Sequence, residues 1–350
     1  LGAYTTTLSV ILSGSGLTNG LDGSMTGTVI SNPIGNGFTN IDSLVSGGNN
    51  DSLTGADTAA GWTVDGANIY TDAASSQDLD FNGFANLFGG TADDTFSLTG
   101  TQSHEIGAGA GNDTLVLADG ALLTGAYDGG TGTDSLDLGA ATAGTAVTLT
   151  GADSSGFSGT VASLAGGFAN LDVVTTGSGT DSLSGLNNDA AWTVSAAGSG
   201  QYLDNSGGGT LDFAGIEDFT GGSGSDTFTI GSGGTAMGVI DGGAGTDTLV
   251  QTDGTNAWDI TGLDAGDVTD IGSFTGIENV TGGSGADTFV FANGQSISGD
   301  LDGGSGSDEL DLGNYTTDVS VTIGSHGAAG AAGTTSGAIL NSFAGVDSLV

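Results

Sequence analysis

Nine aspartates at the ends of glycine-rich turns are the residues of this sequence best suited to chemistry. Each is followed by Thr, Ser or Glu and then by Leu or Phe, and they lie at positions 51, 94, 113, 134, 181, 226, 247, 287 and 308. Glycine lets a backbone direct its carbonyls toward a shared centre at positive φ, and aspartate adds charged oxygen. Carbonyl and carboxylate oxygens together form the shell that Ca²⁺ prefers. The turns therefore predict calcium binding.

The spacing of the turns predicts the elements that position these aspartates. Neighbouring turns lie about 20 residues apart or about twice that, an average step of about 21 residues, and such a fixed period is typical of a solenoid. The segments after the turns alternate as strands do, for example TFSL at 95–98 and TFTI at 227–230. The sequence predicts an all-β fold, a right-handed parallel β-solenoid or β-roll with coils of about 21 residues. The alternative is a string of β-sandwich domains, which needs no such period.

The charge of the chain excludes several classes of partner. It contains no lysine or arginine but 41 aspartates and glutamates, for a formal net charge of −41. Proteins that bind nucleic acid or anionic lipid use basic side chains, so neither partner is expected. No stretch of about 18 consecutive apolar residues occurs, so direct membrane insertion is not expected either. The self-repulsion must be screened by cations, and calcium ions are the expected partners.

Four turns carry the fullest form of a recurring motif, namely 221–228 (GGSGSDTF), 241–249 (DGGAGTDTL), 282–289 (GGSGADTF) and 302–310 (DGGSGSDEL). They resemble the Gly-Gly-x-Gly-x-Asp-x-apolar-x motif of the RTX, or hemolysin-type calcium-binding, family, and the turns at 109–115 and 128–136 match nearly as well. The resemblance implies calcium ions between turns on successive coils of a parallel β-roll. The ligands it implies are Asp94, Asp113, Asp128, Asp134, Asp226, Asp241, Asp247, Asp287, Asp302 and Asp308.

The sequence departs from that family in its spacing. RTX repeats run in tandem every nine residues, whereas these turns come about 21 apart in groups of two or three. Asp51 and Asp181 have no turn one step away and are not included among the predicted ligands. A structural interpretation of all the turns stays open, in which Gly-x-x-Asp only makes a tight turn and the carboxylate accepts its own backbone N–H groups.

Longer repeats divide the chain. The segment at 1–10 (LGAYTTTLSV) recurs at 138–147 and 312–321, and each copy leads into a Phe-x-x-apolar-Asp element, beginning at Phe38, Phe168 and Phe343. Related Phe-x-x-apolar elements begin at Phe84, Phe213 and Phe274. We therefore expect one repeat unit over 1–137, a second over 138–311 and the start of a third over 312–350, as in a window of a longer array.

Catalysis is not expected of this segment. Many parallel β-helices are polysaccharide lyases or hydrolases, but lyases of acidic sugars generally use a basic residue, and this sequence contains no lysine or arginine. Catalysis also needs one unrepeated site, whereas the informative residues here repeat. Ice binding would require regular Thr-x-Thr rows, and only scattered ones occur. Trp62, Trp192 and Trp258 could serve as sugar platforms, but stacking inside a solenoid is the favoured interpretation. His104 and His326 lack a partner for a transition metal.

The whole pattern also resembles the repeat regions of very large secreted bacterial surface proteins of the adhesin and hemolysin type. The resemblance implies a calcium-stabilised extracellular structural filament or adhesin stalk, at the cell surface or in a biofilm matrix. Its partners would be calcium ions, further copies of the filament or continuing chain, and a surface or glycan ligand bound outside this window. The alternative is a calcium-binding secretion or spacer module of a secreted toxin or enzyme.

Overall fold

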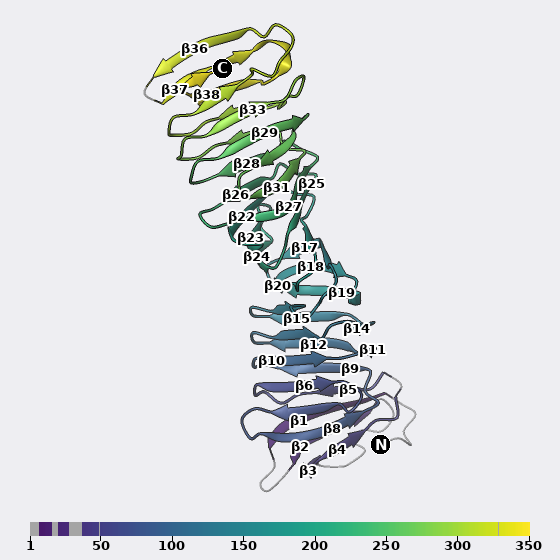
Figure 1. The fold of residues 1–350 in the computed structure, drawn as a ribbon. Helices are drawn as coiled ribbons and strands as arrows, with labels where there is room; N and C mark the ends of the chain where they lie inside the picture. Colours follow the sequence, from purple (N-terminus) through teal and green to yellow (C-terminus); the bar gives the residue numbers. More distant parts are fainter. Residues whose placement is uncertain (1–6, 16–19, 28–36, 49, 328) are drawn as a thin grey trace. The chain divides into compact units, whose positions relative to one another are not determined.

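The computed structural model describes residues 7–15, 20–27, 37–48, 50–327 and 329–350 and is all-β. It divides into two compact units, Leu1–Gly179 and Thr180–Val350. Within the described residues, one 3₁₀ turn, η1 (Ser336–Ala338), is the sole helical element, and no helix is long and apolar enough to cross a membrane. In each unit the strands form two sheets, called here sheet 1 and sheet 2 (Figure 1).

The described residues of the first unit place twelve strands in sheet 1 and eight in sheet 2. In the order in which they lie side by side, the strands of sheet 1 are β3 (Phe38–Ile41), β2 (Leu21–Gly27), β1 (Leu8–Ser15), β5 (Ser52–Thr54), β9 (Asn86–Gly90), β12 (Glu105–Ala110), β15 (Tyr127–Thr131), β19 (Leu164–Leu171), β18 (Gly156–Val161) and β17 (Ala146–Asp153), with the short β11 (Thr101–Gln102) and β14 (Leu122–Leu123) beside them. Those of sheet 2 are β4 (Ser43–Val45), β8 (Gln77–Asn82), β7 (Ile69–Asp72), β6 (Ala60–Val64), β10 (Asp94–Leu98), β13 (Thr114–Leu117), β16 (Ser135–Asp137) and β20 (Val173–Thr175).

The second unit repeats this arrangement. Its sheet 1 contains β21 (Ser182–Ser184), β25 (Asp218–Gly222), β27 (Ala236–Gly243), β31 (Ile271–Thr275), β30 (Ala265–Val268), β29 (Ala257–Gly262), β33 (Thr288–Phe291), β35 (Glu309–Asp311) and β39 (Ser348–Leu349). Its sheet 2 contains β24 (Gly209–Ala214), β23 (Ser199–Asp204), β22 (Ala190–Ala196), β26 (Thr227–Ile230), β28 (Thr248–Gln251), β32 (Asn279–Thr281), β34 (Asp300–Asp302), β38 (Ser342–Val346), β37 (Gly330–Thr335) and β36 (Val321–Gly327).

Parallel runs of short strands stack identical positions and so build the core. In the first unit, Trp62, Phe96, Leu115 and Leu136 occupy successive strands in register, and all four are buried. The indole of Trp62 stacks on Phe96 at 5.2 Å between ring centroids. Trp192 begins an equivalent column with ring stacking at 5.3 Å between centroids, and Trp258 begins another with ring stacking at 5.5 Å. The prediction that the tryptophans fill the interior is therefore confirmed.

Antiparallel triplets of strands interrupt the parallel runs, a feature that the sequence interpretation missed. Six triplets occur among the described residues: β1–β2–β3, β6–β7–β8, β17–β18–β19, β22–β23–β24, β29–β30–β31 and β36–β37–β38. In five of them the Phe of a Phe-x-x element lies in the last strand, and Phe84 lies two residues after the end of β8. Each doubled spacing between turns thus contains a triplet.

A glycine in the middle strand lets the phenylalanine ring lie across a triplet. A Cβ at Gly159 would come 2.4 Å from the ring of Phe168, and one at Gly200 would come 3.1 Å from that of Phe213. The predicted all-β fold with parallel strands is confirmed. Parallel pairing at about this period is the pairing of a solenoid, whereas β-sandwiches are built from antiparallel sheets.

Candidate metal sites at the turn aspartates

The nine turn aspartates share one environment. Each stands at or directly before the first residue of a short strand in a parallel run, and each is at most 2% exposed. Alternation in the strands explains this burial: in β10, Asp94, Phe96 and Leu98 all face inward while Thr95 and Ser97 do not. Asp51 and Asp181, which spacing had set apart, are buried in the same way.

The buried carboxylates form ladders along the parallel runs. The backbone N–H of Asp94 donates to Oδ1 of Asp113 at 2.7 Å, and the N–H of Asp113 donates to Oδ1 of Asp134 at 2.8 Å. In the second unit the N–H of Asp226 donates to Asp247 at 2.7 Å. The same bond joins Asp287 to Asp308 at 2.9 Å and Leu8 to Asp51 at 2.7 Å. In each case a carboxylate oxygen therefore accepts the backbone N–H, where a parallel sheet would ordinarily use a backbone carbonyl oxygen.

Acidic residues of the Phe-x-x elements end the ladders. The N–H of Asp134 donates to Asp172 at 2.8 Å, that of Asp247 to Glu278 at 2.7 Å, and that of Asp308 to Asp347 at 3.1 Å. Glu217 accepts from Asp181 in the same manner. These residues were not among the predicted ligands, although the recurrence of an acid four residues after a phenylalanine was a usable signal.

The opposite ends of the ladders differ from one another. Asp94 and Asp226 begin theirs, and no oxygen of either carboxylate accepts a hydrogen bond of good geometry, although the backbone N–H groups of Ala60 and Ala190 lie close enough to favour the charged form. Asp287 receives the backbone N–H of Asn256 at 2.7 Å and its side-chain Nδ2 at 2.9 Å on the same oxygen. Asn256 stands two residues before Trp258, where the other two copies have Ala60 and Ala190. An asparagine in that position satisfies the first carboxylate of a ladder.

The second carboxylate oxygens are also buried and lack a partner. This holds for Oδ2 of Asp113, Asp134, Asp247, Asp287 and Asp308. The oxygen fits because the first glycine of the turn has no side chain: a Cβ at Gly221 would lie 2.4 Å from Oδ2 of Asp226, and one at Gly282 would lie 2.5 Å from that of Asp287. Unpaired acceptors in the interior are costly, so these oxygens require protons, cations or water.

The remaining glycines of the motif are required by the stacking of one turn on the next. A Cβ at Gly132, where φ is +139°, would come 1.7 Å from the carbonyl oxygen of Gly111. At Gly245 and Gly306 the same contact would occur at 2.0 and 1.7 Å. The Gly-Gly-x-Gly-x-Asp pattern thus has a packing function whether or not an ion is bound.

Burial shifts the ionisation of the ladder. It raises the pKa of Asp94 to about 7, with a further contribution from the charge of Asp113, and that of Asp226 to about 7, with a contribution from Asp247. Burial likewise raises the pKa of Asp134 to about 6 and that of Asp247 to about 6, and the donated N–H groups oppose the shift. The ladder carboxyls therefore favour a proton or another cation over an unpaired charge.

Three predicted ligands lie elsewhere. Asp128 and Asp302 are exposed and Asp241 is half-buried, and each lies in the strand that leads into its turn. Oδ1 of Asp128 accepts from Nδ2 of Asn170 at 2.6 Å. Asp241 and Asp302 accept the N–H of the residue two positions on, at 3.1 and 2.9 Å. The ten predicted ligands therefore form two sets, one inside the fold and one on its surface.

The arrangement limits what an ion could use. Nowhere in the described part of the chain do three acidic or histidine side chains converge on a point that could hold a metal. The ladder nevertheless offers single carboxylate oxygens without partners, beside stacked turns rich in backbone carbonyls. Calcium takes six to eight oxygens, carbonyls and water included. The residues present fit such an ion if carbonyls and water supply most of its shell.

Comparison of the chain with protein-family models and with curated protein sequences finds no match. The RTX resemblance accordingly depends on the turn motifs alone.

Proposed function

We propose that this chain is a structural stalk or filament segment of a large secreted bacterial surface protein, stabilised by calcium. The observation that carries the proposal is repetition: the same turn, ladder and tryptophan-led core column recur in both units. Solenoids with such repeats act as extended scaffolds, because each repeat contacts mainly its neighbours and the array can lengthen without a new fold.

Calcium is the proposed ligand because the buried negative charge has no partner in the chain. With no lysine or arginine among 41 acidic residues, the unpaired oxygens of Asp94, Asp226 and their neighbours can be neutralised only by protons or by ions from solution. Hard oxygen ligands in glycine-rich turns suit Ca²⁺ better than softer metals. We place the ions at the turns of the ladder runs, and we propose that the parallel runs close into a right-handed coil of about 21 residues per turn.

Thermal unfolding tests this proposal. Circular dichroism of the purified segment at pH 7.5 should show a higher melting temperature in millimolar Ca²⁺ than in chelator, because the ion binds the folded state preferentially. Mg²⁺ serves as the matched control, since it demands a smaller, stricter octahedral shell and should stabilise less. Equal melting temperatures in calcium and in excess chelator would refute the calcium part of the proposal.

A further inference from the structure

One outward position departs from the repeat. Phe88 in β9 precedes a glycine pair, as Thr220 and Thr281 do in the second unit, so an aromatic residue replaces threonine there. Its neighbour in register is Gly107, at the place that Asp241 has in β27. A Cβ at residue 107 would lie 2.9 Å from Cδ1 of Phe88. The two departures are therefore coupled, since glycine makes the room that the ring occupies.

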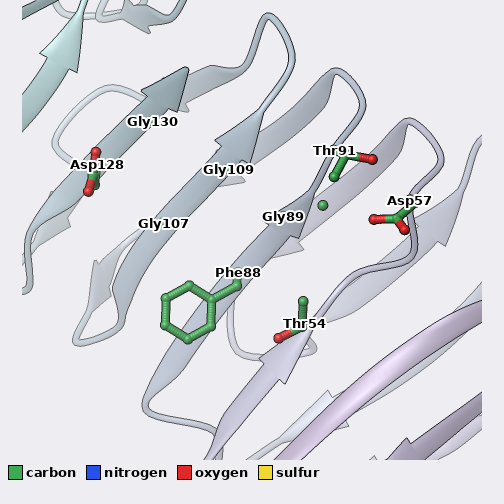
Figure 2. A pocket seen from close by; sticks show the side chains of 10 residues that line it. Thr54, Asp57, Phe88, Gly89, Thr91, Gly107, Gly109, Asp128 and Gly130 are labelled. Carbon is green, nitrogen blue, oxygen red and sulfur yellow. The ribbon is translucent and has the colours of Figure 1, made fainter. Parts of the chain in front are cut away.

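The departure creates a groove on the outer face of sheet 1. Its volume is about 490 Å³, and the glycines of β9, β12 and β15 form its floor. Figure 2 shows the ring of Phe88 face-on beside Thr54, with Asp57 and Thr91 toward one end and Asp128 on the far strand. Phe88 is 41% exposed and is the one aromatic side chain among the strongly exposed large hydrophobic residues in the described part of the chain.

The chemistry of the groove favours a flat organic cation. Thr54, Phe88, Gly107 and Asp128 follow one another in register, so the groove spans three strand spacings, roughly 14 Å. Asp57 and Asp128 are both exposed, and no basic side chain of this chain opposes them. An aromatic face attracts cations, and the planar guanidinium both stacks on a ring and pairs with carboxylates.

We propose that this groove binds an arginine side chain of a partner protein, with the guanidinium stacked on Phe88 and paired with Asp128 or Asp57. Since these 350 residues contain no arginine, a second copy of the segment cannot supply it. The floor of the groove consists of glycines from the ladder turns, but Phe88 and Asp128 are exposed and are not members of a ladder. Binding there would give the stalk a surface that docks a basic partner.

A peptide carrying two arginines and its lysine counterpart are the probes. Isothermal titration in about 0.3 M salt, where the Debye length is only about 5 to 6 Å, reduces attraction to the net negative charge. The wild-type chain should prefer the arginine peptide severalfold. The double variant Phe88→Thr/Gly107→Asp restores the residues found in the second unit, so it should fold, and it should bind the arginine peptide roughly fivefold more weakly.

The double variant also separates this proposal from unspecific attraction, because it adds a negative charge. Equal or tighter binding by that variant, or equal binding of the two peptides by the wild type, would overturn the proposal. Phe88→Leu provides a second variant that keeps apolar bulk, and it too should lose the arginine preference. Asp128→Asn should weaken binding more than the matched Asp259→Asn, an exposed carboxylate of the other unit. Phe88-dependent binding of a neutral oligosaccharide in place of the peptide would mark a glycan groove and overturn the assignment.

Discussion

Replacing Ala190 with asparagine should stabilise the second unit. The reason is visible at the ladder of Asp287 and Asp308, where Asn256 donates its N–H and its Nδ2 to one oxygen of Asp287, at 2.7 and 2.9 Å. Neither buried oxygen of Asp226 has a side-chain donor, and Ala190 occupies the place of Asn256. Ala190 is 1% exposed, so an asparagine there would point into the same interior.

The size of the effect follows from the cost of the unpaired oxygen. Leaving a buried acceptor unsatisfied costs about 1–3 kcal/mol, and fixing an asparagine side chain opposes part of the gain. We expect Ala190→Asn to raise the free energy of unfolding by about 1 kcal/mol, or about 2–4 °C in melting temperature for a unit of this size. The reciprocal change Asn256→Ala should lower it by a similar amount, because it removes the Nδ2 donor and leaves Asp287 only the backbone N–H of residue 256.

The assay is denaturant and thermal unfolding in excess chelator, repeated in calcium. If an ion already satisfies Asp226, the gain from Ala190→Asn should shrink when calcium is present. The reasoning is refuted if Ala190→Asn is neutral or destabilising in chelator while Asn256→Ala is tolerated, since the carboxylate would then not need the donor.

Two further predictions concern pH and glycine. Folding raises the pKa of Asp94 and Asp226 from 3.8 to about 7, so the folded state keeps protons that the unfolded state releases. In chelator, the free energy of unfolding should therefore be greatest near pH 4 and fall as the pH rises toward 7. Thermal melts across that pH range measure this. Stability that rises with pH over this window would contradict the burial argument. Gly132→Ala should cost several kcal/mol in denaturant unfolding, because its Cβ would meet a carbonyl 1.7 Å away, whereas Gly120→Ala, at φ +71° with open space, should cost roughly 1 kcal/mol. Similar losses at the two glycines would show that the turns are not tightly stacked.

Period and alternation were sufficient to predict the parallel runs, because stacked strands repeat identical positions. They did not reveal the antiparallel triplets, although local signals existed. Asp204 accepts the N–H groups of Ser206 and Gly208, a typical turn arrangement, and Gly200 provides room for the ring of Phe213. The triplets depend on which segments pair with one another, and the period alone does not specify their order along the sheet.

The direction of the turn aspartates was equally hard to predict. A charged residue in a glycine-rich turn is expected at the surface, but the first glycine of the motif opens an interior space that the carboxylate fills, as at Gly221 and Asp226. The structural interpretation placed the N–H donors within the turn itself, whereas the carboxylate accepts the N–H of the aspartate at the preceding strand of the run, as Asp247 does from Asp226. That bond spans 21 residues of sequence and depends on the stack.

Calcium binding by the variant Asp113→Asn tests the central claim most directly. Asparagine keeps an oxygen in place to accept the N–H of Asp94, which now bonds Asp113 at 2.7 Å, but it removes the charge that an ion would bind. Titration calorimetry of the folded wild type and variant at pH 7.5 gives the number and affinity of bound ions. The account predicts that the variant stays folded and binds fewer calcium ions, or binds them at least tenfold more weakly. Unchanged calcium stoichiometry and affinity would show that the ladder carboxylates are not ligands.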